Sequence, residues 1–144
     1  MKTILLIHGP NLNLLGQRNA NLYGNFTLAE LENVIKQEAR MLGMKVIARQ
    51  SNHEGELIDF LQQHGKKADG IIINPGALAH YSYALHDALL DAPAPAVEVH
   101  LSNIAKREKW RAVSVTAPAC RKIIGGKKIQ GYLEALRYLH KLKK

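Results

Sequence analysis

The stretch Gly70-Ile71-Ile72-Ile73-Asn74 places three adjacent isoleucines between a glycine and an asparagine. Isoleucine is β-branched and favours strands. A strand with one face in water alternates apolar and polar residues, whereas this run has no polar residue among its isoleucines. The run therefore predicts a strand that is buried on both faces, as in a parallel sheet with helices on each side.

Strands and helices alternate along the rest of the chain. Further short strands are expected at residues 4–7, 45–49, 96–100 and 113–116. Apolar residues recur at helical spacing in the segments 27–42, 51–64, 83–90 and 128–142. This pattern predicts one α/β domain over residues 1–144, with a flavodoxin-like, doubly wound, five-stranded parallel sheet of order 2-1-3-4-5.

Two helix starts have the pattern of a capping box, in which a hydroxyl side chain and a later carboxylate satisfy free backbone N–H groups. The first is Thr27-Leu28-Ala29-Glu30, and the second is Ser51-Asn52-His53-Glu54. We therefore expect Thr27 and Ser51 to cap the helices that follow them.

Residues 9–24, reading GPNLNLLGQRNANLYG, form a long polar connection between the first strand and the first helix. Such connections usually take about 2–6 residues in α/β units. This one carries Asn11, Arg18 and Tyr23 among several polar side chains. A long polar loop after a buried strand is typical of an active-site lid. A surface loop rich in turn-forming residues is the alternative.

Composition places the chain among soluble globular proteins, with 47% hydrophobic and 22% charged residues. The first apolar run, residues 4–7, is too short for a signal peptide or a membrane span. Cys120 is the single cysteine, so no intrachain disulfide is possible, and a reducing, cytoplasmic location without a membrane partner is expected. We expect Cys120 to be a buried, inert thiol.

The net charge of +8 is concentrated near the C-terminus. Residues 121–144 contain eight lysines and arginines against the single carboxylate of Glu134. Such a run is usually a solvated face and less often a polyanion site. We therefore do not expect nucleic acid as a partner, although a polyanion-binding protein remains an alternative.

Polar side chains with catalytic or binding potential follow the predicted strands, where ligands bind in doubly wound sheets. They are Asn11, Arg18 and Tyr23 after the first strand, His53 after the second, Asn74 and His80 after the third, and Glu98, His100, Ser102, Arg107 and Arg111 at or after the fourth. Chance would scatter such residues over both edges of the sheet. Taken one at a time, these residues have simpler explanations. The asparagines could be turn formers, His100 could have a structural role, and the arginines could belong to a solvated face. A buried Glu98 would require a partner.

Several chemistries lack their sequence signatures. The chain has no GxGxxG, no GxxxxGK[ST] and no GxSxG, which disfavours dinucleotide, P-loop and serine-hydrolase sites. The histidines and Cys120 form no compact ligand set, so neither a metal nor another cofactor is expected. A non-enzymatic flavodoxin-like module for flavin or nucleotide is a second alternative, disfavoured by the missing phosphate loop.

These residues support a proton-transfer reaction that needs no metal. Tyrosine normally ionises at about pH 10, and a nearby cation favours the phenolate. If the loop folds so that Arg18 and Arg107 lie near Tyr23, that residue becomes a base able to remove a proton α to a carbonyl. His100 could supply the matching acid, and Asn11 could hold an enolate oxygen.

Several specific blocks follow one another along the chain: residues 9–16 (GPNLNLLG), Arg18 with residues 22–24 (LYG), residues 50–55 (QSNHEG), residues 74–77 (NPGA) with His80, residues 98–103 (EVHLSN), and Arg107 with Arg111. With these blocks the chain resembles the type II 3-dehydroquinate dehydratases of the shikimate pathway. The first and the fifth block are highly specific.

The resemblance implies a lyase that reversibly dehydrates 3-dehydroquinate to 3-dehydroshikimate by anti elimination through an enolate, within aromatic amino-acid biosynthesis. It implies that Tyr23 is the base, that Arg18 activates it, that His100 protonates the leaving hydroxyl and that Asn11 steadies the enolate with a water. The substrate-binding residues implied by the family are Asn74, His80, Leu101 through its backbone, Ser102 and Arg111. Glu98 would orient His100, and Arg107 would support the site.

Family resemblance also implies a homododecamer in which Asp87 reaches the site of a neighbouring subunit. The chain departs from the family pattern at Leu78-Ala79, at Ala112-Val113 and at Gly126-Lys127. None of these departures falls on a proposed catalytic residue, so they bear on subunit contacts and on the C-terminal geometry.

Overall fold

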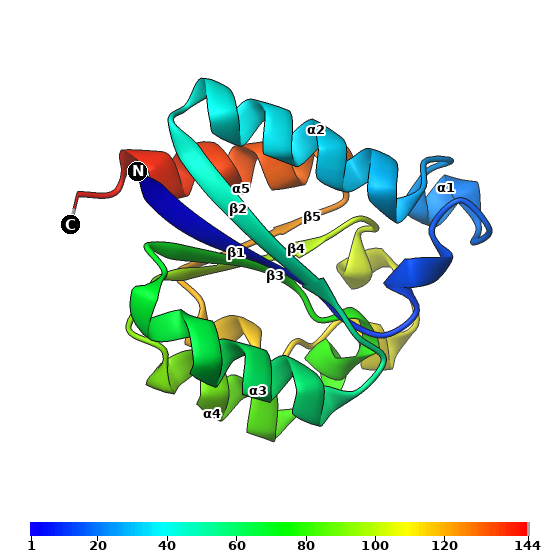
Figure 1. Cartoon of the computed structure of the whole chain (residues 1–144). Coiled ribbons are helices and arrows are strands. Elements are labelled where there is room, and N and C mark those ends of the chain that lie inside the picture. Colours follow the sequence, from blue (N-terminus) through cyan, green and yellow to red (C-terminus); the bar gives the residue numbers. More distant parts are fainter. Residues whose placement is uncertain (144) are drawn as a thin grey trace.

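A computed structural model, which describes residues 1–143, contains a parallel sheet of order β2-β1-β3-β4-β5 (Figure 1). The strands are β1 Lys2–His8, β2 Met44–Gln50, β3 Gly70–Asn74, β4 Ala96–His100 and β5 Lys122–Gly125. The helices are α1 Ala20–Tyr23, α2 Leu28–Met41, α3 Glu54–His64, α4 Tyr83–Asp91 and α5 Ile129–Lys141. The predicted fold class and strand order are confirmed.

Strand β3 lies in the middle of the sheet and is buried along its whole length. Side chains alternate across a strand. Ile72 accordingly packs in the apolar cluster that β1, α2 and α5 share, and Ile71 and Ile73 pack in the cluster that α3 and α4 cover. Figure 1 shows these two helix pairs on opposite faces of the sheet. The prediction of a strand buried on both faces is therefore confirmed.

The predicted fifth strand, residues 113–116, is wrong. Its backbone makes contacts with loops instead of a strand: the Val115 N–H donates to the Ala79 carbonyl at 2.6 Å, and the Val113 carbonyl accepts from the His80 ring at 2.8 Å. The fifth strand is β5, which pairs with β4 at the sheet edge. It is four residues long, begins at Lys122 and ends at Gly125, and its Ile123 is 47% exposed. It therefore shows little of the apolar pattern that identifies a buried strand.

The two predicted capping boxes differ in outcome. The Thr27 side chain accepts a 3.1 Å hydrogen bond from the Glu30 N–H and caps α2 as expected. Ser51 does not cap α3, because the helix begins later, after His53. The Ser51 hydroxyl instead accepts from the His53 N–H at 2.9 Å and donates to Glu56 at 2.6 Å, which makes a local turn ahead of the helix.

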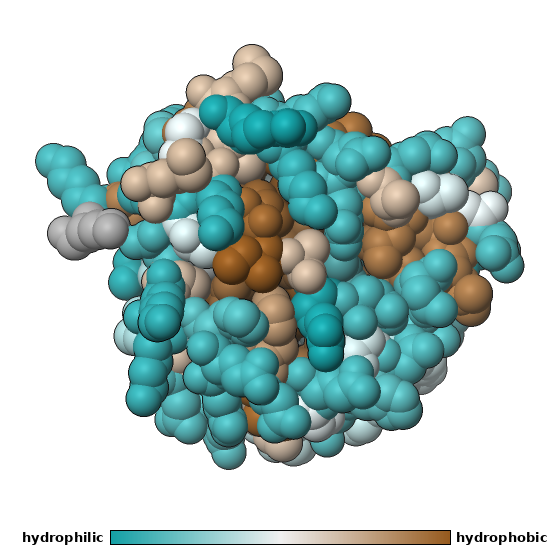
Figure 2. All heavy atoms as spheres, viewed as in Figure 1, coloured by the Kyte–Doolittle hydropathy of each residue, from teal (hydrophilic) through white to brown (hydrophobic). Residues whose placement is uncertain are grey.

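The carboxyl ends of the strands and the loop that carries α1 lie at one end of the molecule, and both chain termini lie toward the other (Figure 1). Hydrophilic residues cover most of the face seen in Figure 2, with smaller hydrophobic patches between them. No helix among residues 1–143 is long and apolar enough to cross a membrane.

Candidate active site

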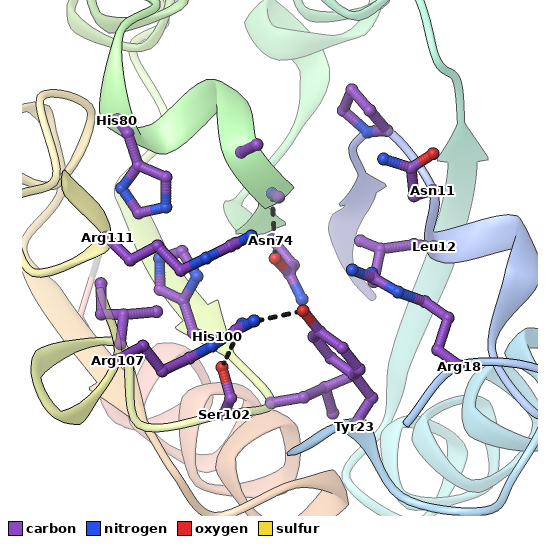
Figure 3. A pocket seen from close by; sticks show the side chains of 15 residues that line it. Asn11, Leu12, Arg18, Tyr23, Asn74, His80, His100, Ser102, Arg107 and Arg111 are labelled. Atoms are coloured by element: carbon purple, nitrogen blue, oxygen red, sulfur yellow. Dashed lines mark hydrogen bonds between the residues drawn. The ribbon is translucent and has the colours of Figure 1, made fainter. Parts of the chain in front are cut away.

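A cavity opens at the carboxyl ends of β1, β3 and β4, where the sequence predicts a ligand site (Figure 3). It contains about 520 Å³ of space, counting the part open to solvent. Its lining residues are Pro10, Asn11, Leu12, Arg18, Tyr23, Asn74, Gly76, Ala77, His80, His100, Leu101, Ser102, Ile104, Arg107 and Arg111.

The predicted site residues thus line this cavity, with three exceptions. Glu98 lies behind His100 and is fully buried in β4. Asp87 is exposed on α4 and lies outside the cavity of its own chain. His53, the further candidate from the loop after β2, is exposed next to α3 and does not line the cavity.

Tyr23 is held between two arginines. Nη1 of Arg107 donates a 2.8 Å hydrogen bond to the Tyr23 hydroxyl oxygen, and the same nitrogen lies 3.3 Å from the Ser102 hydroxyl (Figure 3). The guanidinium carbon of Arg18 lies 3.7 Å from the centroid of the Tyr23 ring. The phenol oxygen therefore contacts Arg107, and Arg18 covers the ring face.

The loop that carries Tyr23 has more local structure than predicted. Residues Leu12–Leu14 form a 3-10 turn, η1, and α1 forms one helical turn whose N-cap, Asn19, accepts from the Asn21 N–H at 3.0 Å. Gly24 ends α1 with a φ of 88°, a conformation that glycine adopts without strain. This turn directs Tyr23, the last residue of α1, toward the cavity.

The start of the loop is anchored to neighbouring loops. Asn11 has a φ of 69°, and its N–H donates a 2.9 Å hydrogen bond to the Asn52 side chain. A Cβ at position 9 would lie 2.2 Å from the Pro75 carbonyl oxygen, so only glycine allows the loops after β1 and β3 to approach this closely. These contacts hold Asn11 at the cavity wall.

His100 and Glu98 form a buried pair on β4. Nε2 of His100 lies 2.8 Å from Oε2 of Glu98, which is 0% exposed. The Glu98 carboxylate also accepts hydrogen bonds from Ser114, at 2.6 Å, and from Thr116. The prediction that a buried Glu98 needs a partner is confirmed. Because Nε2 is engaged, Nδ1 is the His100 nitrogen that remains for a ligand.

The opposite wall of the cavity carries His80 and Arg111. Nδ1 of His80 donates to the Val113 carbonyl at 2.8 Å, because a carbonyl can only accept, and Nε2 is left for a ligand. The Trp110 ring meets the His80 ring edge-on at 5.2 Å and lies 4.1 Å from the Arg111 guanidinium. Arg111 also pairs with Glu108, and this hydrogen bond lowers the pKa of the Glu108 carboxyl.

The segment 104–111 forms two separate 3-10 turns, η4 Ile104–Lys106 and η5 Lys109–Arg111. Arg107 follows the first turn and Arg111 ends the second, so they do not lie on one helix face. Both side chains nevertheless reach the cavity.

Sequence reasoning missed the residues that support the site from behind. Ser114 and Thr116 bind Glu98, and Tyr132 binds Asn74. The alternation of hydroxyl residues with valines at 113–116 is a usable signal, since it places two hydroxyls on one side, but the same pattern also fits a strand. No local pattern pointed to Tyr132, which lies 58 positions from Asn74.

Ion pairs within the protein neutralise part of the basic C-terminal segment. Lys122 and Lys127 both contact Glu134, at 3.2 and 2.7 Å, and Arg137 contacts Glu38 at 2.8 Å. Within residues 1–143, no group of three or more histidine, cysteine, aspartate or glutamate side chains is arranged to hold a metal ion.

The sequence matches the family model of dehydroquinase class II over residues 2–140. It is 53% identical over 136 residues to the 3-dehydroquinate dehydratase of Roseiflexus castenholzii (strain DSM 13941 / HLO8), covering 94% of this chain and 87% of that protein. It is 50% identical over 140 residues to the 3-dehydroquinate dehydratase of Rhizobium meliloti (strain 1021), covering 97% and 95% of the two chains.

The fold is similar to those of solved type II dehydroquinases. The enzyme from Butyrivibrio crossotus DSM 2876 superposes with a TM-score of 0.93 at 45% identity, covering 96% of this chain and 97% of the other. The enzyme from Propionibacterium acnes superposes with a TM-score of 0.94 at 38% identity, covering 97% of each chain.

Proposed function

The chain belongs to the dehydroquinase class II family, and from that premise we propose that it catalyses the reversible dehydration of 3-dehydroquinate to 3-dehydroshikimate. This lyase reaction belongs to the shikimate pathway of aromatic amino-acid biosynthesis. The observation that carries the proposal is the contact between the Tyr23 hydroxyl and Arg107 inside the cavity, because it couples a potential base to a cation where a substrate would bind.

Tyr23 is the base in this proposal. As the phenolate, it removes the proton at C2, next to the C3 ketone, and the electron pair moves to the ketone oxygen to give an enolate. Arg18 and Arg107 stabilise the negative charge on Tyr23 before the transfer. Asn11, which lines the cavity with an exposed side chain, steadies the enolate oxygen together with a water.

His100 is the acid that completes the elimination. When the enolate returns to the ketone, the C1–C2 double bond forms and the C1–O bond breaks, and His100 donates a proton to the departing hydroxyl to give water. Glu98 holds Nε2 of His100, which supports a role for Nδ1 facing the substrate. Ser114 and Thr116 bind the same carboxylate and so fix its orientation.

The remaining lining residues bind the substrate. 3-Dehydroquinate carries a carboxylate and several hydroxyl groups, which require cations and hydrogen-bonding groups. Arg111, Ser102, His80 and the backbone of Leu101 provide these from one side, and Asn74 provides an amide from the end of β3. An arginine is well suited to a carboxylate because its planar fork of donors matches the two oxygens.

The direct test is to mix the purified protein with 3-dehydroquinate and to follow the ultraviolet absorbance of the conjugated enone in 3-dehydroshikimate. A substrate deuterated at C2 should react more slowly if proton removal by Tyr23 limits the rate. Heat-inactivated protein is the control. An absorbance trace no steeper than this control would contradict the proposed function.

We further propose a homododecamer in which Asp87 of one subunit contributes to the site of the next. Its exposed position on α4, outside its own cavity, supports this arrangement. Light scattering should return a mass near twelve times the 16.0 kDa of one chain. A monomer at micromolar concentration would contradict it. The cytoplasmic location, and the expectation that nucleic acid is not a partner, stay predictions.

A further inference from the structure

Tyr132 contacts Asn74, a residue of the cavity wall, but does not itself line the cavity. It belongs to α5, is 0% exposed, and packs in the apolar cluster shared by β1, α2 and α5. Burial raises the pKa of its phenol, so the group stays neutral at physiological pH. Its hydroxyl oxygen accepts a 2.9 Å hydrogen bond from Nδ2 of Asn74 at the end of β3.

The side-chain amide of Asn74 is held at both ends. Oδ1 accepts a 3.1 Å hydrogen bond from the Gly76 N–H, while Nδ2 donates to Tyr132. A backbone N–H can only donate, so an inverted amide would set two donors against each other at Gly76. Gly76 has a φ of 60°, and a Cβ there would lie 3.0 Å from the Pro10 carbonyl oxygen, so this turn is closely packed.

One N–H group of Asn74 remains for a ligand. An amide nitrogen carries two hydrogens, and among residues 1–143 Nδ2 has the Tyr132 oxygen as its hydrogen-bond partner. The amide is planar, so fixing one N–H fixes the direction of the other. Asn74 lies in the cavity wall, at the centre of the group of side chains in Figure 3.

We propose that Tyr132 is a positioning residue, which fixes the Asn74 amide so that an N–H donor faces an acceptor oxygen of the substrate. This inference rests on the proposed function of the cavity. Without the Tyr132 hydroxyl, the amide keeps a single anchor at Gly76 and turns more freely about its terminal torsion, which is intrinsically broad for asparagine. The donor would then be presented to the substrate for a smaller part of the time.

The first test is the kinetics of Tyr132→Phe, which removes one oxygen and keeps the ring that packs in the core. We expect KM for 3-dehydroquinate to rise about 3- to 10-fold, the effect of weakening one ordinary hydrogen bond. We expect kcat to change much less, because the lost contact binds substrate and transition state alike. An unchanged KM would overturn the proposal.

Tyr138→Phe is the matched control. Tyr138 is half-buried on the same helix and packs against the same cluster, but it does not line the cavity or touch Asn74. We expect its kinetics to be those of the wild type, and equal effects of the two substitutions would overturn the proposal. In an Asn74→Ala background, Tyr132→Phe should add no further rise in KM, since the residue that it positions is gone. Additive effects would show that Tyr132 acts through packing alone.

A second measurement does not depend on catalytic activity. In ¹⁵N-labelled protein, the side-chain NH₂ signals of Asn74 can be assigned by their loss in Asn74→Ala. We expect these signals to shift and to exchange faster with water in Tyr132→Phe, and to stay in place in Tyr138→Phe. Unchanged signals in Tyr132→Phe would overturn the positioning role. A wild-type protein without activity on 3-dehydroquinate would instead contradict the proposed function, and this measurement would still decide the role of Tyr132.

Discussion

Nη1 of Arg107 donates a 2.8 Å hydrogen bond to the hydroxyl oxygen of Tyr23, although 84 positions separate the two residues. Arg107 follows β4, and Tyr23 ends α1 in the long loop after β1. The contact therefore joins loops from two strands that are not neighbours in the sheet, since β3 lies between them. It places a donor on the oxygen where the proposed mechanism requires a negative charge, while Arg18 covers the ring.

Replacing Tyr23 by phenylalanine should nearly abolish turnover and leave binding of 3-dehydroshikimate close to that of the wild type. The ring keeps its shape, and only the base is lost. Loss of a general base typically costs on the order of 100- to 10,000-fold in rate. Steady-state kinetics and calorimetric titration with the product measure the two effects. If more than about a tenth of the turnover remained, well short of this range, the base role would move to His100 or His80.

Replacing Arg107 or Arg18 by glutamine should lower kcat at neutral pH, because each change removes a cation that stabilises the phenolate. The Arg107→Gln effect should be the larger, since Arg107 contacts the oxygen and Arg18 contacts the ring face. Raising the pH should restore part of the rate in both variants, because a higher pH also generates phenolate, whereas Tyr23→Phe should not recover.

The measurement for the arginines is the pH dependence of kcat, with Arg121→Gln as control. Arg121 is exposed and lies outside the cavity, so its replacement should leave the profile unchanged. Each tenfold loss of rate corresponds to about 1.4 kcal/mol of transition-state stabilisation. A parallel loss at every pH in Arg107→Gln would argue that this residue only binds substrate.

The fold was predictable where the apolar pattern reflects burial. Strand β3 has three isoleucines and is buried on both faces, so its sequence and its position agree. Strand β5 is a short edge strand with an exposed isoleucine, and its local sequence contains little that separates it from a loop. The segment 113–116 had the better strand pattern, but its valines and hydroxyls are explained by loop contacts and by Glu98, which are tertiary interactions.

The site was predictable to the extent that it follows from topology. Side chains at the carboxyl ends of parallel strands meet at one edge, and this brought Asn11, Asn74 and His100 to one cavity. Contacts between distant segments were not predictable in this way. The short-range sequence could not show that Arg107 rather than Arg18 touches the Tyr23 oxygen, or that Tyr132 holds Asn74.

Cys120 should be chemically inert in the native protein. Cys120 is half-buried and not fully buried as expected, and this partial burial, with a smaller contribution from the negative charge of Glu98, raises the pKa of its thiol to about 12. At pH 8 roughly one thiol in ten thousand is then ionised, and the thiolate is the reactive form. Intact-mass spectrometry should show slow alkylation by iodoacetamide in buffer and rapid alkylation in denaturant. Equal rates in the two conditions would contradict the raised pKa.

The contact between Glu32 on α2 and the fully buried His8 should make stability depend on pH in the acidic range. Oε1 of Glu32 lies 3.2 Å from Nε2 of His8. This contact with His8, with a smaller effect from Lys36, lowers the pKa of Glu32 from its ordinary value of 4.5. The native state therefore binds a proton at Glu32 less readily than the unfolded chain does.

A lowered carboxyl pKa stabilises the native state above the unfolded value of 4.5, and this contribution is lost as the pH falls through the folded value. Glu32→Gln should therefore lower the thermal midpoint at pH 6 and have a smaller effect at pH 3, where the wild-type carboxyl is also protonated. Asp59→Asn, at an exposed carboxylate on α3, is the control and should shift the midpoint little at either pH. Scanning calorimetry at one fixed scan rate measures the differences between variants. Equal destabilisation by Glu32→Gln at the two pH values would mean that Glu32 contributes through packing and not through its charge.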